Sequence, residues 1–482
     1  MLTLPRILSP VLLVSVCVAL AACAAPPRSL NTIYGRSAQH HGPERNPIIV
    51  IPGILGSVLV QDDTDRTVWG AFESETADPQ KPDGARLLAL PIASNTPLHE
   101  LRDDVRPDGV LDRVRVTLLG IPVAIRAYVG ILATLGAGGY TDADINGRGL
   151  NSIDYGEGHF TCYQFDYDWR RDNVENAQRL AAFIEEQRAK LQVEYEARYG
   201  IKDADIEFDI VAHSMGGLLT RYFMRYGDAD LPADGSLPAL TWAGAEHVDR
   251  VILVGTPNAG AGEAFEQLLN GYDPGKPVLP HYPAAVMGTY PSVYQLLPRP
   301  RHKRVLFEGA EETPVGDLYD ARLWDQYGWG LAGRSKDVSR FLEVALPDVA
   351  DAEERREIAI GFQASALSRA RQFHAAMDRP ADLPDGVEMY LFAGDLENTV
   401  DRIEIDPQTG EGRVKDRAPG DGTVVRYSTL LDERTGQDWE PFVVSPIDWT
   451  DVNFVPADHI GLTSNASFAN NVLYLLLEEG RD

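Results

Sequence analysis

One serine of this 482-residue chain stands where a nucleophile could be built. Ser214 is the middle residue of Ala212-His213-Ser214-Met215-Gly216, which follows an apolar strand pattern at 206–211 and precedes a helical run at 217–224. A strand-to-helix turn this tight strains the serine backbone by about 1–3 kcal/mol and requires small residues two positions to either side. Ala212 and Gly216 meet that requirement, and the positive end of the following helix favours the negative charge that develops during acyl transfer. The segment therefore predicts a nucleophile elbow with Ser214 as the nucleophile.

A serine hydroxyl needs a base to take its proton, and the base needs a carboxylate to orient it. Five histidines follow Ser214 in the chain, at positions 247, 281, 302, 374 and 459. Only His459 lies beyond Asp421, which stands in a Gly-Asp-Gly loop. The order serine, acid, histidine is that of the α/β-hydrolases. We therefore predict Ser214, Asp421 and His459 as the catalytic residues, with Asp395 as the competing candidate for the acid.

The tetrahedral intermediate of acyl transfer carries an oxyanion that needs two N–H donors. One is expected to be the backbone N–H of Met215, directly after the nucleophile. The other should come from the loop at 52–57, whose glycines allow the backbone to approach a substrate closely. We assign the N–H of Ile54 to this role, and the neighbouring N–H of Leu55 is the alternative.

The elements that must position these residues alternate along the chain. Apolar runs typical of buried strands occur at 46–51, 160–165, 206–211, 248–254 and 387–392, and helical spacing occurs at 174–199 and 465–477. Strands that alternate with helices predict a mostly parallel sheet with helices on both faces. The fold class is therefore α/β, of the α/β-hydrolase kind.

Two stretches that break the alternation of strands and helices predict the domain organisation. The hydrolase core spans 47–260 and resumes at 386–482, with a lid-like insertion of loops at 61–115 and a cap at 261–385. An extended loop is expected at 397–419. The apolar stretch at 118–138 contains Pro122, Arg126 and several glycines, which favours a core helix after a strand over a membrane span.

The N-terminus predicts export and a lipid anchor. Arg6 precedes an apolar run at 11–20, and Leu20-Ala21-Ala22-Cys23 resembles the lipobox of bacterial lipoproteins. Residues 1–22 would then be a signal peptide, Cys23 would be lipidated, and 23–46 would form a tether. Because Ala24 is not an aspartate, we expect the bacterial cell envelope, at the outer membrane, as the location.

Charge and cysteine content narrow the possible partners. The net charge of −28 argues against nucleic acid and against attraction to anionic lipid. With Cys17 removed and Cys23 modified, Cys162 has no intramolecular partner, so we expect it to be a buried strand residue.

No cofactor and no metal are predicted from the acidic motifs. The segment 142–147 opens like a calcium loop, but its twelfth position is Ile153 instead of a carboxylate. Asp166 and Asp168, beside Arg170 and Arg171, are expected to form structural ion pairs.

Six motifs together resemble the lecithin:cholesterol acyltransferase family, which includes phospholipid:diacylglycerol acyltransferases and lysosomal phospholipases. They lie, in the order of the family, at 51–57, 165–170, 212–217, 255–258, 290–298 and 420–424. The resemblance implies an α/β-hydrolase core with a cap, the Ser214–Asp421–His459 triad, and acyl-enzyme chemistry on lipid esters. Animal members of the family carry a disulfide-closed loop soon after the first strand, whereas residues 61–115 of this chain contain no cysteine. Trp69 is expected to be an exposed apolar contact in this segment.

The sequence thus predicts a serine acyltransferase that moves an acyl chain from a phospholipid or other lipid ester to an alcohol or to water. A purely hydrolytic lipase, phospholipase or esterase is the first alternative. A lipoprotein that binds lipid without turnover is the second. The oligomeric state is not predicted.

Overall fold

The computed structural model describes residues 29–72, 76–111, 113–118, 121–126, 128–144, 161–272, 280–309 and 311–480. The expected signal peptide, Cys23, Ile153 and the end of the calcium-like motif lie outside these residues. A short helix, α2 (Leu30–Ile33), precedes the first strand.

A six-stranded sheet forms the centre of the fold, in the order β16-β13-β10-β9-β1-β8 with every neighbouring pair parallel. Its strands are β1 (Ile48–Ile51), β8 (Cys162–Gln164), β9 (Phe208–His213), β10 (Val248–Val254), β13 (Glu388–Gly394) and β16 (Asp451–Val455). The four middle strands are apolar runs buried almost throughout, as parallel strands covered on both faces must be. The predicted α/β-hydrolase fold class is confirmed.

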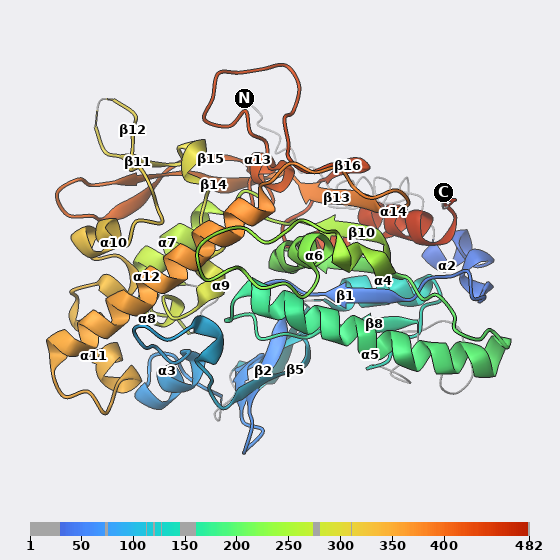
Figure 1. Cartoon of the computed structure of the whole chain (residues 1–482), viewed down its shortest axis with the longest axis horizontal. Helices are drawn as coiled ribbons and strands as arrows, with labels where there is room; N and C mark the ends of the chain where they lie inside the picture. Colours follow the sequence, from blue (N-terminus) through green and yellow to red (C-terminus); the bar gives the residue numbers. More distant parts are fainter. Residues whose placement is uncertain are drawn as a thin grey trace, which may run out of the picture.

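Helices cover both faces of this sheet (Figure 1). On one face α5 (Asn173–Tyr199) and α6 (Met215–Tyr226) pack against the alternate residues Ile49 and Ile51 of β1. On the other face α4 (Val129–Ala137) and α14 (Ala466–Leu477) pack against Ile48 and Val50. Because successive side chains of a strand point to opposite faces of the sheet, the apolar run of β1 contributes to two hydrophobic cores, one on each face.

The stretch predicted to be an insertion of loops is more ordered than expected. The strand β2 (Ser57–Gln61) ends where this stretch, 61–115, begins. Within the stretch lie the strands β3 (Thr67–Trp69), β4 (Ala71–Phe72) and β5 (Val105–Val110) and the helix α3 (Pro82–Leu88). A hairpin of β6 (Arg113–Leu118) and β7 (Ile121–Arg126) follows and leads to α4. The apolar stretch at 118–138 is therefore a strand followed by a core helix, as predicted. No helix in the described part of the chain is long and apolar enough to span a bilayer.

The expected extended loop at 397–419 is a β-hairpin instead. Its strands β14 (Glu397–Ile405) and β15 (Gly412–Gly420) pair antiparallel, and β14 also pairs with β11 (Val305–Phe307). Val400, Ile403 and Ile405 are buried in it. The many charges on the exposed positions of the hairpin concealed its alternating apolar residues.

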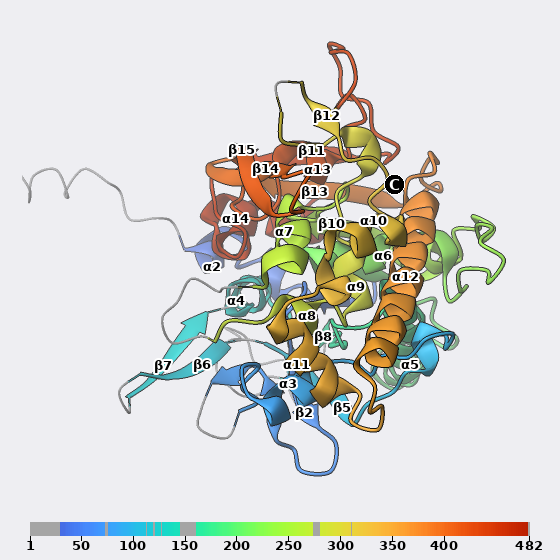
Figure 2. The same cartoon turned by 90° about the vertical axis from the view of Figure 1, so that its left-hand side faces the viewer.

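Most of 261–385 is helical and gathers at one end of the sheet (Figure 2). Besides β11 and β12 (Thr313–Pro314), it comprises α7 (Gly262–Asn270), α8 (Ala284–Met287), α9 (Pro291–Tyr294), α10 (Ala321–Tyr327), α11 (Lys336–Ala345) and α12 (Ala352–Met377). The short helices were expected, but the 26-residue α12 was not. After the β14–β15 hairpin, α13 (Arg426–Leu430) leads back toward the sheet.

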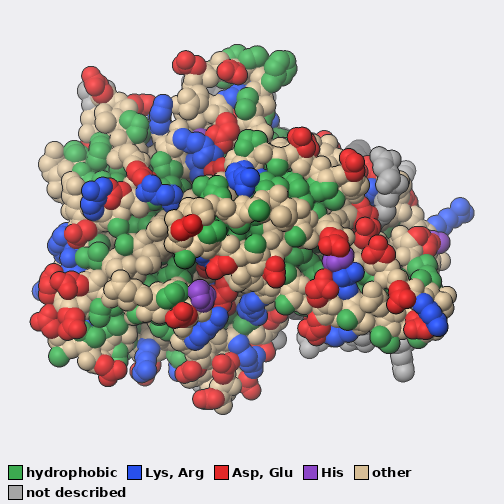
Figure 3. Space-filling view, in the orientation of Figure 1, with side chains coloured by type: hydrophobic (Ala, Val, Ile, Leu, Met, Phe, Trp, Pro, Cys, Tyr) green, Lys and Arg blue, Asp and Glu red, His purple; other side chains and the backbone are tan. Residues whose placement is uncertain are grey.

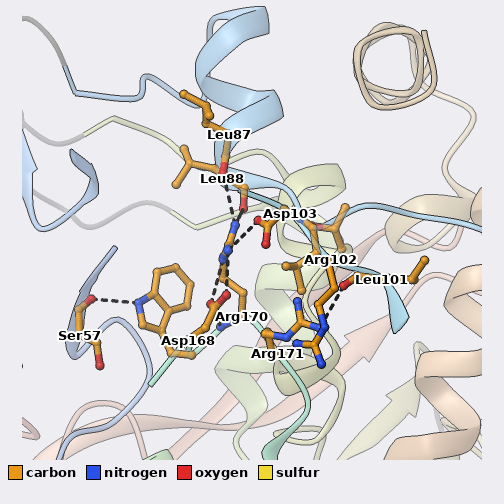
Figure 4. Close-up of polar contacts among 12 residues, drawn as sticks. Ser57, Leu87, Leu88, Leu101, Arg102, Asp103, Asp168, Arg170 and Arg171 are labelled. Atoms are coloured by element: carbon orange, nitrogen blue, oxygen red, sulfur yellow. Dashed lines mark hydrogen bonds and ion pairs between the residues drawn. The ribbon is translucent and has the colours of Figure 1, made fainter. Parts of the chain in front are cut away.

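A buried arginine joins the segment around α3 to the core (Figure 4). Arg170 is fully buried and pairs at 2.8 Å with both Asp168 and Asp103. Its guanidinium also donates to the carbonyl of Leu88 at 3.1 Å. Asp168 thus forms a structural ion pair as predicted, whereas Asp166 accepts a backbone N–H, that of Gly109, at 2.7 Å. Removing one partner of such a buried pair costs about 3–5 kcal/mol, so this contact fixes the segment in place.

Candidate active site

Ser214 occupies the strained turn that its sequence predicts. It follows β9 and precedes α6, with φ 54° and ψ −126°, a backbone conformation that L residues rarely adopt. The turn leaves no room for side chains nearby, since a Cβ at Gly216 would collide with the carbonyl of Pro52. A Cβ at Gly53 would likewise lie 2.7 Å from the Cβ of Ser214. The proline–glycine loop after β1 is therefore pressed directly against the elbow.

The structure brings Ser214, His459 and Asp421 together from three separate parts of the chain. Nε2 of His459 lies 2.9 Å from Oγ of Ser214, and Nδ1 of His459 lies 2.8 Å from Oδ2 of Asp421. The backbone N–H of His459 also donates to the carbonyl of Asp421 at 2.8 Å. These distances allow proton transfer from the serine to the imidazole, with the carboxylate holding the imidazole in the required tautomer.

Asp421, not Asp395, contacts His459. Asp421 is fully buried, and its Oδ1 accepts the backbone N–H groups of Thr423 at 3.0 Å and Val424 at 2.7 Å. Burial would raise the pKa of the Asp421 carboxyl, but His459 and these N–H donors hold it below its ordinary value. Asp395 instead lies 3.5 Å from the guanidinium of Arg426.

The electrostatics around His459 favour its role as a base. Burial would lower the pKa of the His459 imidazole, but the charge and hydrogen bond of Asp421, together with nearby acids, hold the pKa above its ordinary value. Gly255 makes this approach possible, because a Cβ there would lie 3.2 Å from both Asp421 and His459. Charge on a second acid, Glu263 at the start of α7, acts on His459 in the same direction.

The loop predicted to supply an oxyanion donor forms a tight turn. The N–H of Gly56 donates to the carbonyl of Gly53 at 3.0 Å, and Leu55 between them has φ 63°. The N–H groups of Ile54 and Leu55 have no hydrogen-bond partner among the described residues. Met215 begins α6, so its N–H has no acceptor within the helix. All three N–H groups that the sequence nominated thus remain available to a ligand.

Trp69 is not the exposed apolar contact that was expected. Only 5% of its surface is exposed, and its Nε1 donates to the carbonyl of Leu55 at 2.8 Å. Its ring packs edge-on against Trp169 and Tyr282. The indole is buried because its polar edge has a backbone acceptor, and it holds the turn that follows β1.

Sequence reasoning missed three side chains around the triad. His213 is buried between Tyr128, at 2.9 Å from its Nδ1, and the carbonyl of His459, at 3.0 Å from its Nε2. Glu263 lies near enough for its charge to act on His459, and burial raises the pKa of Glu263 to about 7. Tyr128 and Glu263 stand in no motif, although the place of His213 beside the nucleophile was a signal for it.

Cys162 and Asp142, which the sequence raised as a thiol and as part of a calcium-like motif, both make contacts within the protein. Cys162 is buried in β8 as a free thiol, as expected, and lies 3.6 Å from Asp142. Asp142 also accepts from Gln164 at 3.0 Å, so part of the calcium-like motif is occupied by protein donors. No cluster of three or more metal-ligating side chains occurs within the residues that the structure describes.

Comparison with known proteins gives a family match over part of the chain and similar solved structures. Residues 150–321 match the family model of lecithin:cholesterol acyltransferase. The chain is an α/β-hydrolase by fold. A chain of the Tle4–Tli4 complex is similar over 90% of this chain and 98% of its own, with 15% identity and a TM-score of 0.56. The mature Bacillus licheniformis lipase BlEst2 covers 91% of this chain and 95% of its own, with 12% identity and a TM-score of 0.30. None of the curated proteins matches the sequence.

The pH dependence of ester cleavage should respond to Glu263. As Glu263 ionises, with a pKa of about 7, its negative charge raises the pKa of His459, which must be neutral to accept a proton. Replacing Glu263 with Gln removes this charge, so the pKa of His459 falls and the acidic limb of the kcat/KM profile moves to lower pH. The profile is measured with a soluble p-nitrophenyl ester. Glu207→Gln, an exposed position ahead of β9, is the matched control and should leave the limb in place, while a limb that moves to higher pH in Glu263→Gln contradicts the assignment.

Proposed function

We propose that this protein is a serine acyltransferase that takes an acyl chain from a phospholipid or other lipid ester and passes it to an alcohol or to water. The observation that carries the proposal is the contact chain from Ser214 through His459 to Asp421, with separations of 2.9 and 2.8 Å. The family match over 150–321 supports lipid esters as the substrate class.

In the first half of the proposed reaction, Nε2 of His459 accepts the hydroxyl proton while Oγ of Ser214 attacks the ester carbonyl. The resulting oxyanion is held by the N–H groups of Met215 and Ile54, with Leu55 as the alternative donor. Each such donor typically contributes about 2.7–4 kcal/mol to the transition state. The leaving alcohol then takes the proton from His459 and departs, which leaves the acyl group on Ser214.

In the second half, His459 takes a proton from an acceptor that attacks the acyl-enzyme, and it returns that proton to Oγ of Ser214 as the acyl–oxygen bond breaks. Water gives a fatty acid, and an alcohol gives a new ester. Both outcomes use the same residues, so a purely hydrolytic lipase, phospholipase or esterase is the second candidate. The complete contact chain favours either enzyme over a lipoprotein that only binds lipid.

Action at a membrane is the second part of the proposal. Lipidation at Cys23 would anchor the chain in the bacterial envelope, at the outer membrane, because several acyl chains hold a protein stably. Apolar side chains are also exposed beside the site: Leu396 follows Asp395, and Ile460 follows His459.

A protruding loop adds a larger apolar surface. This loop, residues 436–444 between α13 and β16, carries Trp439 and Phe442, which are 79% and 81% exposed, and the half-exposed Val443 and Val444. Hydrophobic side chains gather at its tip (Figure 3). Its base is held by the N–H of Glu433 on the carbonyl of Val444, at 2.8 Å. Because the net charge of −28 opposes binding to anionic lipid, apolar insertion is the route we propose for this loop.

Product analysis separates the candidate functions. Phosphatidylcholine vesicles, with and without a sterol, diacylglycerol or long-chain alcohol, are incubated with the protein and analysed by mass spectrometry. An acyltransferase yields a new ester of the acceptor together with a lysolipid. Fatty acid alone with every acceptor refutes transfer and leaves the hydrolase, and the absence of both products in the presence of folded protein refutes catalysis. Ser214→Ala is the control and should give neither product.

Membrane contact should depend on the protruding loop. In a Cys23→Ala background, Trp439→Ser with Phe442→Ser is expected to weaken sedimentation with phosphatidylcholine vesicles at least about tenfold, since burying each aromatic side chain is worth about 1.5–3 kcal/mol. Val193→Ser is the matched control, because Val193 is 72% exposed on α5, away from this loop. Hydrolysis of a soluble ester should not change. Equal vesicle binding by all variants would contradict the role of the loop.

A further inference from the structure

A chain of three hydrogen bonds runs behind the nucleophile, from the loop after β1 to the loop that carries His459. The N–H of Gly53 lies 2.8 Å from the hydroxyl of Tyr128, which lies 2.9 Å from Nδ1 of His213. Nε2 of His213 lies 3.0 Å from the carbonyl oxygen of His459. Tyr128 and His213 are both buried, and their rings meet edge-on with centroids 5.4 Å apart.

Each proton in this chain has one possible position. The carbonyl of His459 can only accept, so Nε2 of His213 must carry the proton and Nδ1 must be an acceptor. The hydroxyl of Tyr128 therefore donates to Nδ1, and its oxygen accepts the N–H of Gly53. Burial and the neighbouring His459 lower the pKa of His213 to about 3, so the imidazole stays neutral at any ordinary pH.

We propose that His213 and Tyr128 are positioning residues that couple the oxyanion loop to the catalytic histidine. The proposal rests on the proposed function, because it assigns how two parts of that site are held in register. At one end, Gly53 directly precedes Ile54, so the bond from Gly53 to Tyr128 sets where the Ile54 N–H points. At the other end, the bond to the backbone of His459 sets the position from which its imidazole reaches Ser214.

The packing around the hydrogen-bond chain leaves the side chains of Tyr128 and His213 little freedom to move. A Cβ at Gly56 would lie 2.9 Å from the ring of Tyr128, and the rings of His213 and His459 have centroids 4.6 Å apart. The oxyanion loop therefore rests on the Tyr128 ring, and the base rests on the His213 ring. A displacement of about 1 Å at a reacting group can reduce the rate on the order of 10²-fold.

Three variants test the two ends of this hydrogen-bond chain separately. Tyr128→Phe removes both of the hydroxyl contacts. His213→Asn places an amide oxygen where Nδ1 was, which keeps the acceptor for Tyr128 and loses the donor to His459. His213→Gln places an amide nitrogen near the position of Nε2, which keeps the donor to His459 and loses the acceptor for Tyr128. Tyr294→Phe is the matched control, because the Tyr294 hydroxyl is also buried and donates one hydrogen bond, to the carbonyl of Gly288 at 2.8 Å.

The readout is kcat and KM for a soluble ester, expressed per site that a fluorophosphonate probe titrates. We expect Tyr128→Phe and both His213 variants to lower kcat by about 10- to 100-fold with KM nearly unchanged, consistent with misplaced reacting groups. Tyr294→Phe should change the melting temperature alone. If the Tyr128 and His213 variants lose thermal stability but keep wild-type kcat per titrated site, the residues are structural only and the proposal is overturned.

A second measurement does not depend on turnover. In the ¹⁵N-histidine-labelled wild-type protein, the NMR shifts of His213 should report a neutral ring protonated at Nε2 throughout pH 5–8. A ring that is protonated at Nδ1, or that titrates in this range, overturns the proposal. If the wild-type protein neither cleaves esters nor takes the probe, the proposed function fails, and the His213 spectrum still decides whether the hydrogen-bond chain exists.

Discussion

The elbow at Ser214 is the constraint on which the rest of the site depends. The Ser214 hydroxyl can reach His459 because the backbone turns through a positive φ between β9 and α6. That turn requires Gly216 to lie against Pro52, which brings the loop after β1 into contact with the nucleophile. The same turn points the first N–H of α6 toward the position where an oxyanion would form. A larger residue at Gly53 or Gly216 would therefore disturb the nucleophile and both oxyanion donors together.

Three titratable side chains around the elbow, Asp421, His459 and His213, have pKa values that are shifted in different directions by their surroundings. Asp421 is buried and stays ionised because His459 and two backbone donors compensate for the loss of water. Its carboxylate in turn keeps the pKa of His459 above its ordinary value in spite of burial. His213, one residue from the nucleophile, has no carboxylate partner and remains neutral. Two imidazoles 4.6 Å apart thus differ in protonation behaviour because only His459 is hydrogen-bonded to a carboxylate, whereas burial dominates the pKa of His213.

Sequence alone predicted those parts of the molecule that depend on local pattern or chain order. The parallel strands were visible as apolar runs, and Ser214, Asp421 and His459 as a spacing of residue types. The β14–β15 hairpin was missed because charges on its exposed face concealed the alternation. Trp69 was misjudged because a single tryptophan in a polar segment reveals neither its burial nor its acceptor, the Leu55 carbonyl. The chain through Tyr128 could not be predicted, since its members are far apart in sequence and meet only through the fold.

The central claim is that Ser214 is a nucleophile activated by His459 and Asp421. The rate of covalent labelling by a fluorophosphonate probe tests it most directly, with the labelled residue identified by mass spectrometry. The account predicts labelling at Ser214, none in Ser214→Ala, and a loss on the order of 10⁴-fold in Asp421→Asn. Asp395→Asn should label at the wild-type rate. Labelling that survives Ser214→Ala, or that slows in Asp395→Asn and not in Asp421→Asn, would contradict the account.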